Sequence, residues 1–468
     1  MIYLFRSYSA TPYLFDGWSN KIFALDEGFY EFLSTNEGND LSTGMLKKMG
    51  ITLKVAPLLP LDEIFVKIDK AKGPQRIVIE ASQACNLRCS YCAHTLSGSL
   101  TRQRPHRNRH LDQKTMDLII AEYFGSEKNS VKELFFYGGE PLLNFSVIHH
   151  GINQIRKAGS TTLIQLVTNG LLLDDQEMIR FFVTQNVGLQ VSLDGPSHDT
   201  HRLTLDGKGS FEKVMSNLES IKKMYPEYYQ KYVSFNATIP WDSDYHETMN
   251  FFANSDLTKH NWQGQNLEIY EINRSETGDR LPEQKKNRCR NYVTSRGWTK
   301  EFRLSDLVLI QPVLFMGFRK TGATAYSFFH NGCTFYKDSI YVDVDGKCML
   351  CEKTNTHGYL GTLGNDDEVR NGAKNYYKKL YELAAERCDR CWANKICQVC
   401  AGCIGEGELI AQNFDTACRR SKEVCRQELE LYTSLKESGF NFNDAMSFMK
   451  QSSNFAEKHY THVMSRER

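Results

Sequence analysis

The cysteines at positions 85, 89 and 92 are the residues whose spacing most directly predicts chemistry. They form the pattern C-x3-C-x2-C, and Tyr91 directly precedes the third cysteine. Three thiolates on one loop can bind three irons of a four-iron cluster, which leaves the fourth iron open to a small cofactor. A zinc site is the alternative reading. It requires a fourth nearby ligand, which His94 could supply.

The remaining cysteines concentrate in the last third of the chain and predict further metal sites. Of the 14 cysteines, ten fall between Cys333 and Cys425, while Cys289 stands alone. Without a secretory signal, so many thiols indicate metal ligation rather than a disulfide framework. Zinc knuckles are the alternative here, because C-x2-C pairs also bind zinc.

The elements that position the first cysteines follow from hydrophobic periodicity. From about residue 74, extended apolar segments alternate with amphipathic helical ones, which predicts an α/β fold with a parallel sheet. The expected strands are 76–80, 133–137, 163–168, 188–193, 233–239 and 267–272, and the expected helices include 116–123, 176–185 and 211–224. Six such units predict a partial (β/α)6 TIM-type barrel. The cysteine loop follows its first strand, at the end where such barrels carry their chemistry.

Smaller regions flank this barrel. Residues 1–72 are expected to form a small α+β module, a winged-helix module being one candidate, with strands at 3–7 and 21–25 and a helix capped by Asp26. The barrel and a linker occupy 73–324. A cysteine-rich, cluster-binding domain is expected at 325–430, with few long periodic elements, and a helical tail at 431–468.

The composition excludes several classes of partner. The 468 residues carry 57 basic and 56 acidic side chains, for a net charge of +1, so no electrostatic case exists for nucleic acid or a membrane surface. The N-terminus lacks a basic leader with an apolar core, and no apolar run reaches about 18 residues. We therefore expect a cytoplasmic protein.

The cysteine loop resembles the signature of the radical S-adenosylmethionine (SAM) family, and the resemblance covers about residues 74–275. After the second strand, residues 137–141 (YGGEP) resemble the family's GGEP segment; residues 168–170 (TNG) and 192–195 (SLDG) close the third and fourth strands. The resemblance implies that a 4Fe-4S cluster on the three cysteines binds SAM and cleaves it by one-electron reduction.

The same resemblance implies which residues contact SAM. The backbone of the GGEP segment and Glu140 would hold the amino group, Ser192 and Asp194 would lie near the ribose or carboxylate, and Arg202 would pair with the carboxylate. The full set of implied cofactor-binding residues is Tyr91, Gly138, Gly139, Glu140, Pro141, Asn169, Ser192, Asp194 and Arg202.

The C-terminal cysteines resemble those of a SPASM domain, an extension of peptide and sulfatase maturases that binds two auxiliary 4Fe-4S clusters. The resemblance implies a second auxiliary cluster on Cys388, Cys391, Cys397 and Cys418, and a first one on Cys333, Cys348, Cys351 and either Cys400 or Cys403. A hairpin turn at Asp345-Gly346 is expected to bring Cys333 and Cys351 together.

The sequence departs from the SPASM pattern after Cys397. Two x2 steps follow, to Cys400 and Cys403, where the family usually has one x3 step. Cys403 is favoured as the ligand, since its Ala-Gly-Cys context resembles the family's Gly-Gly-Cys. Cys425 and Cys289 are expected to be free thiols.

Two kinds of maturase compete for the function. In sulfatase maturases, an Asp after the cysteine of the first auxiliary site resembles a general base, and here Glu352 holds that position. The segment 340–353 instead resembles maturases of ribosomally made peptides, notably those that form thioethers. We expect a peptide maturase that installs a crosslink, with Glu352 as the candidate catalytic base. A non-catalytic iron-sulfur carrier or scaffold is a third hypothesis.

The expected partners follow from this function. A precursor peptide would add its leader as a strand to the module at 1–72, although that module could equally be a packing clasp over the barrel. An electron donor such as flavodoxin or ferredoxin would reduce the first cluster.

Overall fold

The structure is a computed structural model. The expected strand 267–272 and the cysteines Cys289, Cys333 and Cys403 lie outside the residues that it describes. The residues that the structure describes are 1–36, 40–51, 53–54, 57–92, 106–125, 130–238, 244–259, 291, 313, 316–317, 321, 334–352, 354, 356–397, 399–400, 404, 410–445 and 447.

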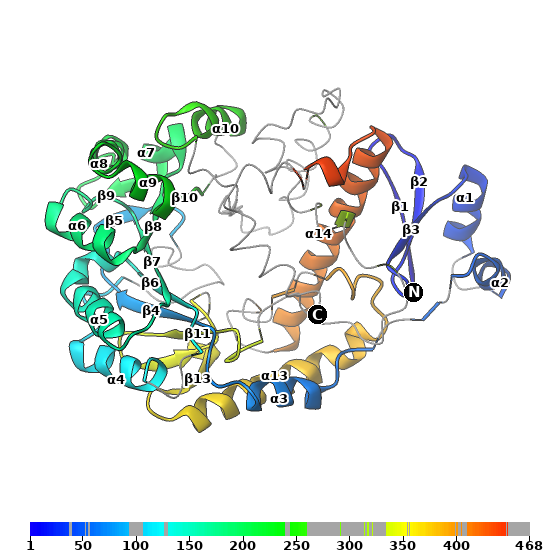
Figure 1. Cartoon of the computed structure of the whole chain (residues 1–468). Helices are drawn as coiled ribbons and strands as arrows, with labels where there is room; N and C mark the ends of the chain where they lie inside the picture. Colours follow the sequence, from blue (N-terminus) through cyan, green and yellow to red (C-terminus); the bar gives the residue numbers. More distant parts are fainter. Residues whose placement is uncertain are drawn as a thin grey trace.

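An eight-stranded sheet forms the frame of the molecule (Figure 1). Its first part has the order β10-β8-β7-β6-β4, and all neighbours in it are parallel. The strands are β4 (Arg76–Ser82), β6 (Glu133–Gly138), β7 (Leu163–Thr168), β8 (Gly188–Ser192) and β10 (Val233–Asn236). The predicted α/β fold with a partial barrel is therefore confirmed, and five of the six predicted strands are found.

Helices cover the outer face of this sheet (Figure 1). They are α4 (Gln113–Tyr123), α5 (Phe145–Lys157), α6 (Gln176–Gln185), α8 (Phe211–Met224), α9 (Pro226–Tyr232) and α10 (Tyr245–Asn254). Aspartate side chains cap the first turns of α4, α6 and α10 by accepting backbone N–H groups. The predicted helix bounds for α6 and α8 match the structure.

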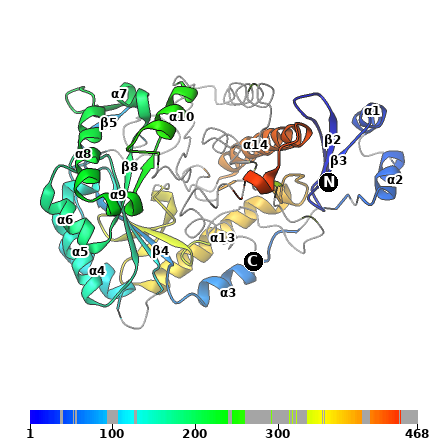
Figure 2. The ribbon, with the colours of Figure 1, turned by 45° about the horizontal axis from the view of Figure 1, so that its top comes forward.

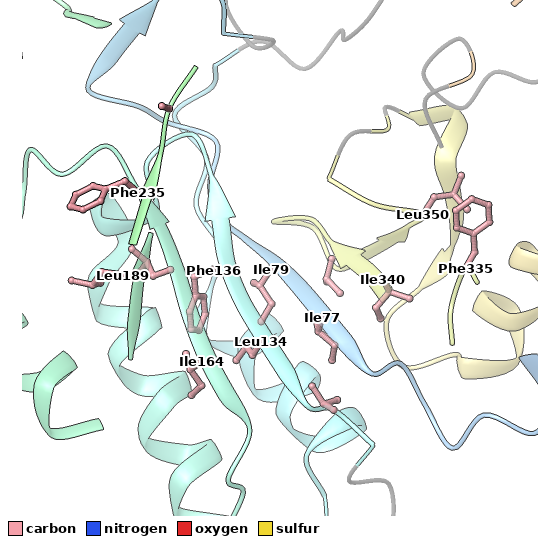
Figure 3. Close-up of a cluster of buried hydrophobic side chains, with 14 of the residues drawn as sticks. Ile77, Ile79, Leu134, Phe136, Ile164, Leu189, Phe235, Phe335, Ile340 and Leu350 are labelled. Atoms are coloured by element: carbon pink, nitrogen blue, oxygen red, sulfur yellow. The ribbon is translucent and has the colours of Figure 1, made fainter. Parts of the chain in front are cut away.

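Alternate strand residues make the core between the sheet and the helices (Figure 3). Ile77 and Ile79 of β4, Leu134 and Phe136 of β6, and Ile164 of β7 are completely buried there. The intervening positions face the inside of the barrel, where Val78 packs with residues of a strand far along the chain. A strand buried on both faces is typical of a parallel sheet in an α/β protein.

The predicted C-terminal hairpin joins this same sheet. β11 (Ser339–Val342) pairs parallel with β4 and antiparallel with β12 (Lys347–Met349), which pairs with β13 (Tyr359–Thr362). Gly346 has a φ of +76° in the turn, which only glycine adopts without strain. The hairpin is therefore found where it was expected, but it extends the barrel sheet.

The expectation of few long periodic elements in 325–430 is wrong. α13 (Asp366–Cys388) and α14 (Ala411–Glu437) have 23 and 27 residues. The C-terminal half of α14 is buried on most sides and includes buried polar residues such as Glu428, Glu430 and Ser434, so no simple apolar stripe marks this helix in the sequence. α14 also crosses residue 430, so the expected boundary of the helical tail falls inside one helix.

The N-terminal region forms a three-stranded antiparallel sheet, β1 (Ile2–Arg6), β2 (Pro12–Asp16) and β3 (Lys21–Ala24), followed by α1 (Glu27–Thr35) and α2 (Asp40–Lys48). Asp26 caps α1 as predicted, by accepting from the backbone N–H of Phe29 at 2.8 Å. A further helix, α3 (Leu61–Asp69), packs on α13.

The N-terminal sheet lies beside α14, at the far end from the barrel helices (Figures 1 and 2). The sheet of this module thus packs on α14, and the choice between a leader-binding site and a packing clasp stays a prediction. None of the described helices is long and apolar enough to cross a bilayer.

Candidate functional site

The three cysteines of the C-x3-C-x2-C loop lie together at the carboxyl end of β4. Burial raises the pKa of Cys85 to about 12, with smaller raising effects from Glu140, Cys89 and Cys92 and a lowering effect from the Leu87 N–H. The Cys85 Sγ accepts from the backbone N–H of Leu87 at 3.4 Å. The three predicted thiols thus lie near enough to interact electrostatically, although their side chains do not converge as the ligands of a single ion do.

The glycines of the GGEP segment let the end of β6 pack against this loop backbone to backbone. A Cβ on Gly138 would collide with the carbonyl oxygen of Ser82, and one on Gly139 with that of Ala84. The Gly139 N–H donates to Ser82 O at 2.7 Å, and the Glu140 N–H to Ala84 O at 2.8 Å. Their glycine identity therefore serves the close approach of two protein segments.

Glu140 is completely buried and ties the ends of two strands together. Its carboxylate accepts from the Thr168 hydroxyl at 2.8 Å and from the backbone N–H groups of Asn169 at 2.8 Å and Leu142 at 3.1 Å. Burial raises the pKa of Glu140 to about 7, against the lowering effect of these bonds. The expected contact with the SAM amino group stays a prediction, since the described contacts of this carboxylate are to its own chain.

Asn169 links β7 to the cysteine loop. Its side-chain amide donates to Asn86 Oδ1 at 2.7 Å and lies 3.9 Å from the Cys85 Sγ. Thr168 and Asn86 therefore belong to the site, although the sequence analysis gave them no role. The TNG motif marked the strand end, but nothing in it indicated that Thr168 serves Glu140.

Asp194 and Arg202 form a buried ion pair beside Cys89, the second cysteine of the loop. Arg202 Nε and Nη2 donate to the two carboxylate oxygens at 2.7 and 3.1 Å, and the Tyr91 hydroxyl donates to the same carboxylate. The Thr238 N–H also donates to Asp194, at 2.8 Å. The guanidinium lies 5.3 Å from the centroid of the Tyr91 ring.

This ion pair holds the cysteine loop from the other side. The short strand β5 (Leu87–Cys89) pairs with β9 (Arg202–Thr204), with Cys89 opposite Arg202. Arg202 was expected to pair with the SAM carboxylate, but two of its donors are directed to Asp194. The role toward SAM stays a prediction.

His198 stabilises the backbone next to this ion pair through two hydrogen bonds. Its Nδ1 accepts from the Asp194 N–H at 3.3 Å, so Nε2 carries the proton and donates to Ser210 Oγ at 3.0 Å. Ser210 in turn donates to the Arg202 carbonyl at 2.7 Å. Burial lowers the pKa of His198 to about 4, which keeps this imidazole neutral.

The comparisons with known proteins agree with this geometry. Residues 79–251 match the family model described as the radical SAM superfamily. This part of the chain is a radical SAM domain. It contains the end of β4, the cysteine loop and the strand ends that carry Glu140, Asn169 and Asp194.

Two curated relatives share the radical SAM domain. A serine-type anaerobic sulfatase-maturating enzyme from Bacteroides thetaiotaomicron is 32% identical over 179 residues, which are 37% of this chain and 42% of that protein. The radical SAM cyclopropyl synthase TigE from Paramaledivibacter caminithermalis is 25% identical over 196 residues, 40% of this chain and 39% of TigE. The matches thus span less than half the length of these relatives.

The fold similarity extends further than the sequence similarity. The solved structure of native anSMEcpe with bound AdoMet superposes with a TM-score of 0.57 at 19% identity, covering 81% of this chain and 100% of that one. The likeness therefore includes the fold outside the radical SAM domain.

A second group of thiols lines a cavity in the C-terminal region. The lining includes the four cysteines predicted to hold the second auxiliary cluster, Cys388, Cys391, Cys397 and Cys418. The volume is about 280 Å³, several times the roughly 30 Å³ that one water occupies in the liquid. Among the described residues, no three His, Cys, Asp or Glu side chains converge as single-ion ligands do. The four thiols surround a space instead, which fits a multi-atom group.

Cationic side chains line this cavity and would offset the charge of a bound cluster, although burial raises the pKa of Cys388 and Cys418 in the metal-free protein. Arg387, Arg419 and Lys422 belong to its lining, along with one acidic residue, Asp415, whose carboxylate pairs with Arg387. Cationic side chains beside a cluster offset its negative charge. None of the three was identified from the sequence, where they appear as ordinary residues of polar helices.

The remaining predicted residues are only partly placed. The Cys348 side chain lies in the core, next to Tyr123 of α4, and burial raises its pKa to about 12. Cys351 and Glu352 are half-buried after β12, and Cys400 is exposed. Because Cys333 and Cys403 lie outside the described residues, the first auxiliary site stays a prediction, as does the catalytic role of Glu352.

The other predicted residues lie at strand ends or in the core. Ser192 ends β8, and Pro141 begins the short helix η1 (Pro141–Asn144) that follows the GGEP turn. Cys425 is buried and donates to Ile396 O at 3.2 Å, which suits the free thiol expected there.

Replacing Arg202 with Met tests the buried ion pair. The variant would leave the Asp194 charge buried without a counter-ion, so we expect the free energy of unfolding to fall by about 3–5 kcal/mol. Anaerobic guanidinium unfolding measures this. Lys213→Met breaks the exposed Lys213–Asp174 pair and should cost about 0.5 kcal/mol or less. Equal losses in the two variants would contradict the role given to burial.

The raised thiol pKa values predict how the metal-free protein responds to pH. In the unfolded chain a cysteine ionises near pH 8.5, whereas the folded pKa is about 12 for Cys85 and about 11 for Cys89 and Cys418. Above about pH 8.5 the unfolded chain therefore binds fewer protons than the folded one, so stability falls as pH rises.

Thermal unfolding of the metal-free, reduced protein from about pH 8 to 9.5 measures this slope. The Cys388→Ser/Cys418→Ser variant should show a smaller decrease, because two buried thiols are removed. A stability that rises with pH over this range would refute the prediction.

Proposed function

We propose that this chain is a SAM-dependent maturase that modifies a ribosomally made peptide, by installing a crosslink that is a thioether. The observation that carries the proposal is the presence of two separate thiol sites in one chain, the Cys85 loop and the C-terminal cavity. A radical SAM domain needs only the first. The second, with a small α+β module packed beside it, fits an enzyme that handles a large substrate.

The residues present fit the cofactors that this function requires. Cys85, Cys89 and Cys92 would hold a 4Fe-4S cluster, and SAM bound to it supplies hydrogen abstraction from an unactivated carbon. The cavity thiols would hold one auxiliary cluster, and Cys333, Cys348, Cys351 and either Cys400 or Cys403 would hold another. An electron donor such as flavodoxin or ferredoxin would serve as the reductant.

This chain's own residues orient and enclose that site. Glu140 fixes the ends of β6 and β7 beneath the loop, while Asp194 and Arg202 fix Tyr91 and the β5 strand. Because these groups are buried and hydrogen-bonded, the loop is held in one arrangement. Such preorganisation places the reacting atoms before the substrate arrives.

The N-terminal module is the proposed binding site of the leader. In the described part of the chain β3 pairs with β2 on one side, and its other edge has no strand beside it. An extended peptide can add to such an edge through main-chain hydrogen bonds.

The similarity to TigE, a radical SAM cyclopropyl synthase, supports radical chemistry beyond sulfatase maturation.

Sulfatase maturation is the second candidate. The 32% identity with the Bacteroides enzyme favours it, and Glu352 retains a carboxylate after Cys351. The substrate would then be a cysteine or serine of a sulfatase, oxidised to formylglycine.

Two measurements separate these hypotheses. Anaerobically reduced protein should release 5'-deoxyadenosine from SAM; a carrier or scaffold would release none. Co-expression with a short peptide encoded nearby should give a product that has lost two hydrogen atoms and does not react with hydroxylamine probes. A product that such probes capture contains an aldehyde and would favour formylglycine.

The Cys351→Ala variant tests the first auxiliary site. We expect it to cleave SAM at a rate close to that of the wild type but to form no crosslink, because the radical site is intact. Glu352→Gln should lower product yield with SAM cleavage retained, if this carboxylate accepts a proton. Normal crosslinking by either variant would remove the corresponding residue from the mechanism.

A further inference from the structure

The N-terminal sheet is apolar on both faces, and the two faces have different partners. Ile2, Leu4 and Leu14 pack with α1 and α2 in a small core of their own. The alternate residues are aromatic and belong to the main core instead: they are Tyr3, Phe5, Tyr13 and Phe15. This aromatic face needs a cover outside the module.

This face is covered by α14 and by the segment between Cys391 and Cys397, two of the proposed ligands of the second thiol site. Trp392, next to Cys391, stacks on Tyr3 with ring centroids 4.0 Å apart and an angle of 10°. Phe15 meets the same indole edge-on at 6.2 Å. A side chain on Gly17 would collide with the Trp392 carbonyl oxygen, so the two backbones are also in contact.

Further contacts continue the interface on both sides of Trp392. Lys395 donates to the Trp18 carbonyl oxygen, and its ammonium lies 5.6 Å from the Trp18 ring centroid. On α14, Ser434 Oγ accepts from the Tyr8 N–H at 2.7 Å, and Glu437 accepts from the Tyr13 hydroxyl at 2.9 Å.

The segment between Cys391 and Cys397 has no helix or strand to fix it. Its backbone is held by short turns, such as Ile396 N–H to Ala393 O at 2.9 Å. Both ends carry thiols that line the 280 Å³ cavity. Ligation of these thiols would close the segment and restrict its conformations, as structural metal sites do.

We propose that the second thiol site fastens the N-terminal module, so that its occupancy fixes the sheet at which the peptide would bind. Trp392 is the positioning residue that connects the two. The role in peptide binding rests on the proposed function, whereas the fastening itself does not.

Hydrogen exchange of the reconstituted full chain, read by mass spectrometry, tests the fastening. Emptying the site with Cys391→Ser/Cys397→Ser should speed amide exchange in Ile2–Arg6 and Pro12–Asp16 by about tenfold or more. Cys85→Ser, which empties the other site, should leave these strands as in the wild type. Leu163–Thr168 in the barrel serves as the internal reference.

Trp392→Ala covers the case in which the cysteine variant fails to fold. It should open the same strands while the iron content and the iron-sulfur absorbance stay unchanged, and Trp392→Phe should restore most of the protection. Wild-type exchange in β1 and β2 with the second site empty, or in Trp392→Ala, would overturn the proposal. So would equal opening in Cys85→Ser.

Peptide affinity is measured separately on the Trp392→Ala protein. A drop in affinity together with faster exchange supports both the fastening and the leader site. Faster exchange with unchanged affinity supports the fastening and counts against leader binding at this module.

Discussion

A short irregular loop of thiols must be held at one place beside the ends of parallel strands, and the rest of the site depends on this constraint. The Cys85 loop has little secondary structure of its own. Two buried carboxylates hold its surroundings: Glu140 joins the ends of β6 and β7, and Asp194 joins Tyr91 to Arg202. A buried charge costs free energy wherever it lacks its partners. Arrangements in which the loop shifts away from these partners are therefore disfavoured.

The two thiol sites are stabilised by different interactions. The Cys85 loop rests on the sheet, through backbone contacts with two glycines and the β5–β9 pairing. Three segments form the second site. The end of α13 supplies Cys388, one face of α14 supplies Cys418, and the turn segment between these helices supplies Cys391 and Cys397. Sheet hydrogen bonds stabilise the first without a ligand. The second site surrounds a cavity, so metal ligation is expected to stabilise it more than it stabilises the first site.

The parallel strands could be predicted from their apolar residues: β4 is buried on both faces and forms a nearly continuous apolar run, while in β7 buried residues alternate with partly exposed ones. The pairing of β11 with β4 could not, since it joins residues more than 260 positions apart and depends on which edge of the barrel is free. For the polar residues, motifs identified Glu140, Asp194 and Arg202, but not which of the site residues bond to one another. Sequence spacing does not distinguish a carboxylate that meets a ligand from one that accepts bonds from its own chain.

For the N-terminal module, too, the sequence does not show the packing partner. The position of this module has a consequence for the substrate. Alternating aliphatic and aromatic residues in β1 and β2 indicate a sheet covered on both faces, but they do not say by what. The structure supplies the cover, α14 and the Trp392 segment, at the end of the molecule opposite the barrel helices (Figure 2). A peptide held at this sheet and modified at the Cys85 loop would have to extend across the C-terminal region. The residues that recognise the peptide and those that react with it are then separated, so a firm leader contact can coexist with variation in the segment that is modified.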